Sequence, residues 1–429
     1  MYSHSTTLFV PLEIGKNVHW LAVYAGFELA TVVEPFAVRS DRHGFAQVTA
    51  VIDRLLASGQ YERIILGHEP TGIYHEAWAR ALYARYVADQ PRLEYHFVNP
   101  LLSKRKRQDN GSGRARKTDT IDLMAIAQCL RDGQSQPAFL PSAQEFAFQL
   151  WGRQFRQLHR EQRHLSVLLL TQIDRLWPGL LVNVERFRHL HPQLEPPIPL
   201  VLSKPLERER LRALLQHCPN PHDFLALGQA GIQAFFRQHL GRCGAATAQV
   251  AYHIVQQAIL PPPPLAALLA QQLQTDFNHY LTLAQRLQCL ADQALDLVHG
   301  SPAEVLVSIP GVSPFLAARY FAYLGHAQRF PNPDLVWAFA GFDPILSQSG
   351  DFRRIGHISR KGQPGLRDTL FLIGLHTARH VPAIARAKEA ARRRGLGHIG
   401  ATLHAAHKAN RLCHYLLFHQ CPFDPQRSR

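Results

Sequence analysis

The sequence lacks several features that would assign it to a specialised class of protein. Its six cysteines are scattered and form no CxxC pair, which excludes a zinc ribbon and a disulfide framework and favours free thiols. No apolar run of about 20 residues is present, so we expect no membrane span. The N-terminus shows no basic segment followed by an apolar one, so we expect no secretion signal. The cysteines are Cys129, Cys218, Cys243, Cys289, Cys413 and Cys421.

Acidic residues are also scarce relative to basic ones. The chain has 47 Lys and Arg against 32 Asp and Glu, a formal net charge of +15, with 25 His in addition. A charge of this size predicts a polyanionic partner, DNA or RNA, over the alternative of a basic protein without one, because the charge is clustered. With 429 residues and 46% hydrophobic content, the chain is long enough for two or three globular domains.

The first hundred residues predict a mixed sheet with helices packed on it. Three strand-like segments come first, and helix and strand then alternate, which is the order of an RNase H-like or RuvC-like fold. The expected strands are residues 7–14, 18–25, 30–38, 63–67 and 93–98, and the expected helices are residues 41–58 and 74–88.

Four carboxylates fall where such a fold would place metal ligands. Asp119 and Asp122 lie on one face at the start of an apolar helical run, directly after a basic block. Glu13 ends the first strand and Glu69 follows the fourth. Because neighbouring strand ends converge, these oxygens predict a Mg²⁺ or Mn²⁺ site. Each also has a plainer interpretation: a polar strand end, a turn residue before Pro70, or a helix N-cap.

The middle of the chain changes character and shows no clear strands. Two long amphipathic segments, residues 144–176 and 265–297, predict helices that bracket an insert and form an antiparallel arm, which would mediate self-association or hold a nucleic-acid scaffold. A plain linking helical domain is the alternative. The four-proline run 261–264 is a stiff spacer or a helix start. The predicted domains are therefore residues 1–140, 141–300 and 301–429, with a mainly α-helical third domain.

The C-terminal part contains two patterns typical of phosphate contacts. The turn Ile309-Pro310-Gly311-Val312 predicts a helix-hairpin-helix element, in which the backbone near Gly311 holds a phosphate; an ordinary helix corner is the alternative. Two serine-containing loops, residues 347–354 and 357–362, then lie among Arg, Lys and Gly. Residue types alone leave open whether they only grip phosphate or also supply a nucleophilic serine.

Taken together, these motifs resemble the DEDD transposases of bacterial insertion sequences, a family that includes Piv-type invertases and bridge-RNA-guided recombinases. The resemblance covers roughly residues 7–132 and 302–418. It is carried by Glu13-Ile14-Gly15-Lys16-Asn17-Val18-His19, Glu69-Pro70-Thr71-Gly72-Ile73-Tyr74, Val98-Asn99-Pro100, Lys117-Thr118-Asp119-Thr120-Ile121-Asp122, Ile309-Pro310-Gly311-Val312, Arg329-Phe330-Pro331, Ala340-Gly341-Phe342-Asp343-Pro344, Ser349-Gly350, Ser359-Arg360-Lys361-Gly362 and Leu366-Arg367.

The resemblance implies a RuvC-like domain that holds Mg²⁺ with the four carboxylates. It also implies a C-terminal serine, for which Ser349 matches best and Ser359 is the alternative, that forms a covalent phosphoserine link to DNA during strand exchange. A structured guide RNA, target and donor DNA, and a homo-oligomer from dimer to tetramer would be the partners, in the bacterial cytoplasm at the nucleoid. One departure is Glu13, where the family usually has Asp.

Two other functions remain open at this point: a RuvC-like structure-selective nuclease that uses water, and a decayed, non-catalytic DNA- or RNA-binding protein. In each case the expected nucleic-acid contacts are the basic block and the C-terminal loops. They are Lys104, Arg105, Lys106, Arg107, Arg114, Arg116, Lys117, Gly311, Arg353, Arg354, Arg360, Lys361 and Arg367.

Overall fold

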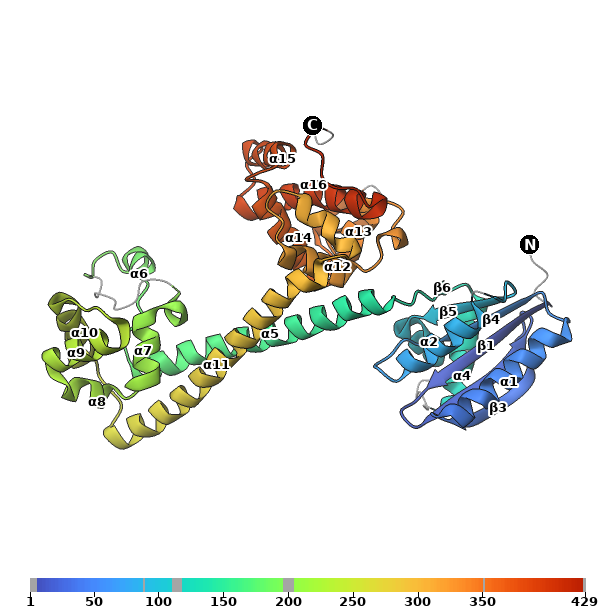
Figure 1. Ribbon diagram of the computed structural model, residues 1–429, viewed down its shortest axis with the longest axis horizontal. Helices are drawn as coiled ribbons and strands as arrows, with labels where there is room; N and C mark the ends of the chain where they lie inside the picture. Colours follow the sequence, from blue (N-terminus) through green and yellow to red (C-terminus); the bar gives the residue numbers. More distant parts are fainter. Residues whose placement is uncertain (1–5, 88, 110–117, 196–203, 350–351, 427–429) are drawn as a thin grey trace. The chain divides into compact units, whose positions relative to one another are not determined.

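A computed structural model describes residues 6–87, 89–109, 118–195, 204–349 and 352–426. Figure 1 follows the chain through its elements, which group into two compact units, Met1–Pro141 and Ser142–Arg429. The first unit is built on a sheet and the second on helices. Among the described residues, none of the helices is both long enough and apolar enough to cross a membrane.

The first unit contains a six-stranded mixed sheet with the strand order β3-β2-β1-β4-β5-β6. The first three strands form an antiparallel meander, β4 and β5 then add parallel to β1, and β6 closes the edge antiparallel to β5. The strands are β1 (Thr7–Ile14), β2 (Val18–Ala25), β3 (Ala30–Arg39), β4 (Arg63–His68), β5 (Leu93–Val98) and β6 (Ser135–Pro137).

Both faces of this sheet are covered, because side chains along a strand alternate between the two faces. Leu8, Val10 and Leu12 face a core shared with α1 (Arg42–Ser58) and α2 (His75–Tyr86). Phe9 faces the opposite core, which is completed by α4 (Asp119–Arg131). The strands predicted from the sequence are confirmed, and the whole arrangement is that of the predicted RuvC-like fold.

Two short elements of this unit were not predicted. Residues 104–107, which were expected only as a basic block, lie in a helix, α3 (Pro100–Asp109). The edge strand β6 has three residues, too few to produce a recognisable alternation. The elements matter here because α3 and α4 pack against each other beside the candidate carboxylates.

The second unit is organised by two long helices, α5 (Ala143–Leu176) and α11 (Pro263–Val298), which pack antiparallel. Trp151 Nε1 donates to the Leu290 carbonyl at 2.9 Å, and Gln172 Nε2 donates to Asp276 Oδ2 at 2.7 Å. The proline run begins α11, with Pro262 as its N-cap and Pro263 in its first turn, so of the two readings the helix start is correct.

One hydrophobic core runs from Phe148 through Leu290 to Leu417, so the predicted boundary near residue 300 falls inside a single unit.

Small helices pack at both ends of the α5–α11 pair. The remaining helices are α6 (Val184–Leu190), η2 (Pro205–Glu207), α7 (Glu209–His217), α8 (Pro221–Ala226), α9 (Gly228–Leu240), α10 (Ala245–Gln257), η3 (Pro302–Ser308), α12 (Pro314–Leu324), η4 (Ala327–Arg329), α13 (Pro333–Phe339), α14 (Pro364–Thr377), α15 (Pro382–Arg393) and α16 (His398–His419).

The serine-rich segment after α13 is a β-hairpin, not the pair of loops that we expected. β7 (Pro344–Ser349) pairs antiparallel with β8 (Phe352–Ile358). Glycine and serine made the segment look irregular, but Ile345, Phe352 and Ile355 supply the β-favouring residues. In the described part of this segment, the irregular stretch is the loop after Ile358.

Candidate metal centre and serine hairpin

The ends of β1 and β4 bring two of the predicted carboxylates to one edge of the sheet. Leu12 pairs with His68 in the parallel β1–β4 ladder. Glu13 is the residue after Leu12, and Glu69 is the residue after His68, so the two carboxylates leave neighbouring strands at the same level. Glu13 is half-buried and makes a contact within the molecule.

Helix α4 supplies the other two carboxylates and holds them differently. Its N-cap is Thr118, whose hydroxyl accepts from the Ile121 amide at 3.3 Å, so Asp119 is not the cap. Asp119 is exposed, whereas Asp122 is 1% exposed. Gly67 lets α4 approach β4 closely, since a Cβ there would lie 2.6 Å from Leu130 Cδ2.

The guanidinium of Arg107 joins Glu69 and Asp122. Arg107 Nη1 lies 2.8 Å from Asp122 Oδ1 and 3.5 Å from Glu69 Oε1. The buried Ser103 hydroxyl, one turn earlier on α3, donates to Glu69 Oε1. Two of the four predicted ligands therefore meet around one cation.

A divalent metal fits this pair chemically. Asp122 Oδ2 is buried and has no hydrogen-bond partner, and an unpartnered buried carboxylate oxygen is costly unless a cation reaches it. Carboxylate oxygens are also the hard donors that Mg²⁺ prefers. Among the described residues, however, no three acidic, His or Cys side chains come close enough to coordinate one ion. The structure brings Glu69 and Asp122 together and does not gather the complete set of four.

Sequence reasoning missed Ser103 entirely and gave Arg107 a different role. The available signal was their spacing of four residues, which places both side chains on one face of α3. That signal has meaning only once α3 is recognised as a helix and α3 is known to pack on α4, which the sequence does not reveal.

The residue before Glu69 is a buried, neutral histidine. Burial, and then the nearby His75 and His19, lower the pKa of His68 to about 3. Its Nδ1 lies 3.0 Å from the Tyr95 hydroxyl. A neutral His68 adds no positive charge beside Glu69 at pH 7, and the cation that contacts both Glu69 and Asp122 is Arg107 on α3.

The basic block divides into engaged and exposed side chains. Arg107 is held by carboxylates, and Lys106 Nζ lies 2.6 Å from Asp132 Oδ2. Lys104 and Arg105 are exposed and remain predicted nucleic-acid contacts. The other three members of the block, Arg114, Arg116 and Lys117, lie outside the described residues.

In the C-terminal part, the backbone of β7 and β8 places Ser349 opposite Phe352, next to the turn of the hairpin. Ser347 pairs with Arg354, and Gln348 pairs with Arg353, so serines and arginines share a narrow ribbon. The side chains of Ser349, Arg353 and Arg354 lie outside the described part of the chain.

The loop after the hairpin folds onto the end of α13. The Ser359 hydroxyl donates to Asp343 Oδ1 at 2.6 Å, and the Ser359 amide donates to the Asp343 carbonyl at 2.7 Å. Arg367 Nη1 donates to the Ala340 carbonyl at 2.9 Å. These bonds give Ser359 and Arg367 structural partners, whereas Arg360 and Lys361 are exposed.

Gly311 is explained by its backbone and its packing. Its φ is +95°, and a Cβ would lie 3.1 Å from the His376 carbonyl oxygen and 3.0 Å from His380 Cδ2. The turn that contains it follows a 3₁₀ helix, η3, and packs against α14. A phosphate contact at Gly311 remains a prediction.

Comparison with known proteins identifies the family of both parts of the chain. A family model for the DEDD transposases of IS110 type matches residues 11–178. A second model, described as the transposase IS116/IS110/IS902 family, matches residues 303–389. The two matches follow the order of the predicted metal domain and the serine-containing domain.

Three relatives agree with these matches. The mini-circle putative transposase for IS117 of Streptomyces coelicolor is 25% identical over 343 residues, which is 77% of this chain and 77% of the relative. An uncharacterized 43.6 kDa protein of insertion element IS110, from the same organism, is 23% identical over 93% of this chain and 91% of its own length. A probable family 20 transposase of Pseudomonas aeruginosa is 30% identical over 136 residues, 32% of this chain and 39% of the relative. The chain therefore belongs to the IS110 family of DEDD transposases.

Proposed function

We propose that this transposase cuts and rejoins DNA through a covalent phosphoserine intermediate, with a divalent metal held in its N-terminal unit. The observation that carries the proposal is the Arg107-linked pair of Glu69 and Asp122. Two carboxylates from distant parts of the sequence share one cation, and one buried oxygen is left without a partner.

Family membership implies DNA as the substrate and divalent metal ions as cofactors. We propose Mg²⁺, replaceable by Mn²⁺, with Glu13, Glu69, Asp119 and Asp122 as ligands. The bound metal would withdraw charge from the phosphodiester that is attacked. Asp119 and Glu13 must approach the Glu69–Asp122 pair for the set to close, and the exposed Asp119 side chain has the freedom to do so.

Ser349 is the proposed nucleophile. Its Oγ would lose its proton and form a bond to phosphorus, and one deoxyribose oxygen would leave and take up a proton. Ser349 is preferred over Ser359 because the Ser359 hydroxyl and amide both bond to Asp343 and hold the loop. Ser349 pairs with Phe352 at the end of the β7–β8 ladder, beside the hairpin turn.

We further propose that a structured guide RNA selects the DNA and that the working form is a homo-oligomer, from dimer to tetramer. The net charge of +15 supports a large polyanionic partner. The metal ligands lie in one unit of the chain and the serine in the other, which suits an assembly in which different protomers complete one site.

The test is incubation of the protein with cognate DNA, guide RNA and Mg²⁺, followed by denaturing electrophoresis for a protein–DNA adduct. Ser349→Ala should abolish the adduct, and Ser359→Ala, the matched control, should retain it wherever the loop still folds. An undiminished adduct in Ser349→Ala with loss in Ser359→Ala would move the nucleophile to the second loop.

A nuclease that uses water is the second candidate, because the Glu69–Asp122 pair lies wholly within the RuvC-like unit. Such an enzyme would still cut DNA in Ser349→Ala and would never form an adduct. Cleavage that needs Asp122 and survives Ser349→Ala would therefore replace the serine mechanism with hydrolysis.

A further inference from the structure

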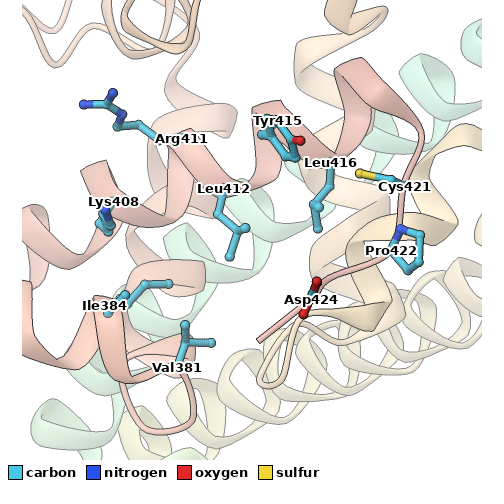
Figure 2. A pocket seen from close by; sticks show the side chains of 11 residues that line it. Val381, Ile384, Lys408, Arg411, Leu412, Tyr415, Leu416, Cys421, Pro422 and Asp424 are labelled. Atoms are coloured by element: carbon cyan, nitrogen blue, oxygen red, sulfur yellow. The ribbon is translucent and has the colours of Figure 1, made fainter. Parts of the chain in front are cut away.

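A cavity of about 570 Å³ lies between α15, α16 and the segment that follows α16. Its lining residues come later in the sequence than both candidate chemical sites. Figure 2 shows its lining side chains, with Ile384 on α15, Leu412 and Leu416 on α16, and Cys421 and Pro422 on the C-terminal segment. Its volume lies within the range of roughly 300–1,000 Å³ that is typical of small-molecule sites.

The polar part of the lining is cationic and aromatic. Lys408, Arg411 and Tyr415 line the cavity at helical spacing along one face of α16, and all three are exposed. Within the described chain, neither Lys408 nor Arg411 forms an ion pair with a carboxylate. Their charges are therefore available to an anion, beside walls made of aliphatic side chains.

Positive charge continues along the neighbouring helix. Arg386, Arg392 and Arg393 on α15 are exposed, and Ile384 at the start of the same helix lines the cavity. The one carboxylate of the lining, Asp424, accepts from the Gln426 amide at 2.8 Å. The side chains that line the cavity are thus mainly apolar and basic, with one carboxylate, Asp424, among them, and α15 also carries the exposed Glu389.

We propose that this cavity binds one unstacked nucleotide of a single-stranded segment of the nucleic acid that the transposase handles. The base would lie against Leu412 and the Tyr415 ring, and its phosphates would contact Lys408 and Arg411. An aromatic ring beside cations and apolar walls matches a nucleotide, which joins a flat apolar base to an anion.

The proposal rests on family membership as a DNA transposase and is independent of the serine mechanism. The absence of an adduct would therefore not contradict nucleotide binding in the cavity. The absence of nucleotide binding would likewise not contradict the predicted adduct.

The experiment uses the full-length protein and short single-stranded oligonucleotides, one set of RNA and one of DNA, that carry a photoreactive 5-iodopyrimidine. After irradiation, peptide mapping should find the crosslink on the peptide that contains Tyr415. Stronger crosslinking of the RNA set would assign the cavity to the guide RNA, and stronger crosslinking of the DNA set to a displaced DNA strand.

Binding of the same oligonucleotides is then measured by fluorescence anisotropy. Lys408→Glu with Arg411→Glu should weaken binding roughly tenfold more than the matched control, Arg392→Glu with Arg393→Glu, which changes the charge equally without lining the cavity. Leu412→Trp keeps all charges, fills the cavity, and should weaken binding similarly. Equal losses in the two charge variants, unchanged binding in Leu412→Trp, or crosslinks confined to other peptides would overturn the proposal.

Discussion

The two units of this transposase carry their candidate chemistry on different supports. In the first, Glu69 follows a strand inside a six-stranded sheet, and Asp122 lies on a helix packed across that sheet. In the second, Ser349 ends one strand of a two-stranded hairpin. A sheet covered on both faces fixes its strand ends, whereas a lone two-stranded ribbon has little stability of its own.

This difference suits the two proposed roles. Mg²⁺ demands near-ideal ligand geometry, so its carboxylates gain from a rigid frame and from Arg107, which holds two of them together. A nucleophile that forms and breaks a bond to DNA must move relative to the phosphate between steps. The comparison therefore predicts that substitutions at the metal site lower the rate of DNA cleavage and also the stability of the fold. Substitution of Ser349 should lower the rate of cleavage alone.

The largest effect is expected for Asp122→Asn. The change removes one negative ligand and keeps the size of the side chain, so strand cutting should fall by roughly 10³-fold or more, the effect of losing several kcal/mol of metal-assisted stabilisation. Cleavage of cognate DNA under single-turnover conditions measures it. Asp132→Asn, at the C-cap of the same helix and paired with Lys106, should retain most activity. Equal losses in both variants would show that Asp122 acts only through folding.

The next largest effect is expected on stability. Arg107→Gln leaves the buried Asp122 carboxylate without its cation, and breaking such a pair costs about 3 kcal/mol of unfolding free energy. Because Mg²⁺ can replace the lost charge, adding Mg²⁺ should stabilise Arg107→Gln more than it stabilises the unmodified protein.

Chemical unfolding with and without Mg²⁺ checks this prediction. Lys106→Gln is the matched control, since it breaks the more exposed pair with Asp132 and should cost about 1 kcal/mol or less. A Mg²⁺ response that is identical in both variants would separate Arg107 from the metal site.

A packing change should have a smaller effect on the same frame. Gly67→Ala places a Cβ against Leu130 and should push α4 away from β4, at a cost of about 2 kcal/mol. Cleavage should fall with it, because Asp122 moves with α4. Gly244→Ala is the control, since nothing lies within 4 Å of its added Cβ. Equal melting temperatures for the two variants would argue against this close contact.

The smallest change is expected for Glu13→Asp. It restores the residue usual in the family and keeps the charge but shortens the reach of the carboxylate by one methylene, so cleavage should change by about tenfold or less in either direction. Single-turnover rates across a Mg²⁺ titration measure it. Cutting that appears only in Glu13→Asp would instead mean that the natural chain is a decayed, non-catalytic DNA-binding protein.

The sequence predicted the sheet well because its strands carry a clear pattern. Residues 7–14 and 63–67 are apolar and β-rich, and turn residues separate the first strands. The pattern could not reveal that α3 is a helix, since Lys104–Arg107 is charged on every side. Nor could it reveal that Arg107 reaches Asp122, because that contact depends on how α3 packs on α4.

The hairpin shows the opposite limitation. Gly350 and the surrounding serines indicated loops, and the cross-strand pairing of Ser349 with Phe352 overrode that local signal. The candidate residues were nevertheless proposed from residue types alone in both units, because carboxylates at strand ends suit a metal ion and serines among arginines suit a phosphate. Their placement in space needed the structure.

One measurement tests the central claim most directly: the chemical location of the DNA-linked phosphate on the protein. The trapped product is digested with nuclease and protease, and the phosphorylated peptide is sequenced by mass spectrometry. The account predicts a phosphoserine at Ser349 that forms in the unmodified protein and is absent in Asp122→Asn. Cleaved DNA with no phosphorylated peptide, or a phosphate on Ser359, would contradict it.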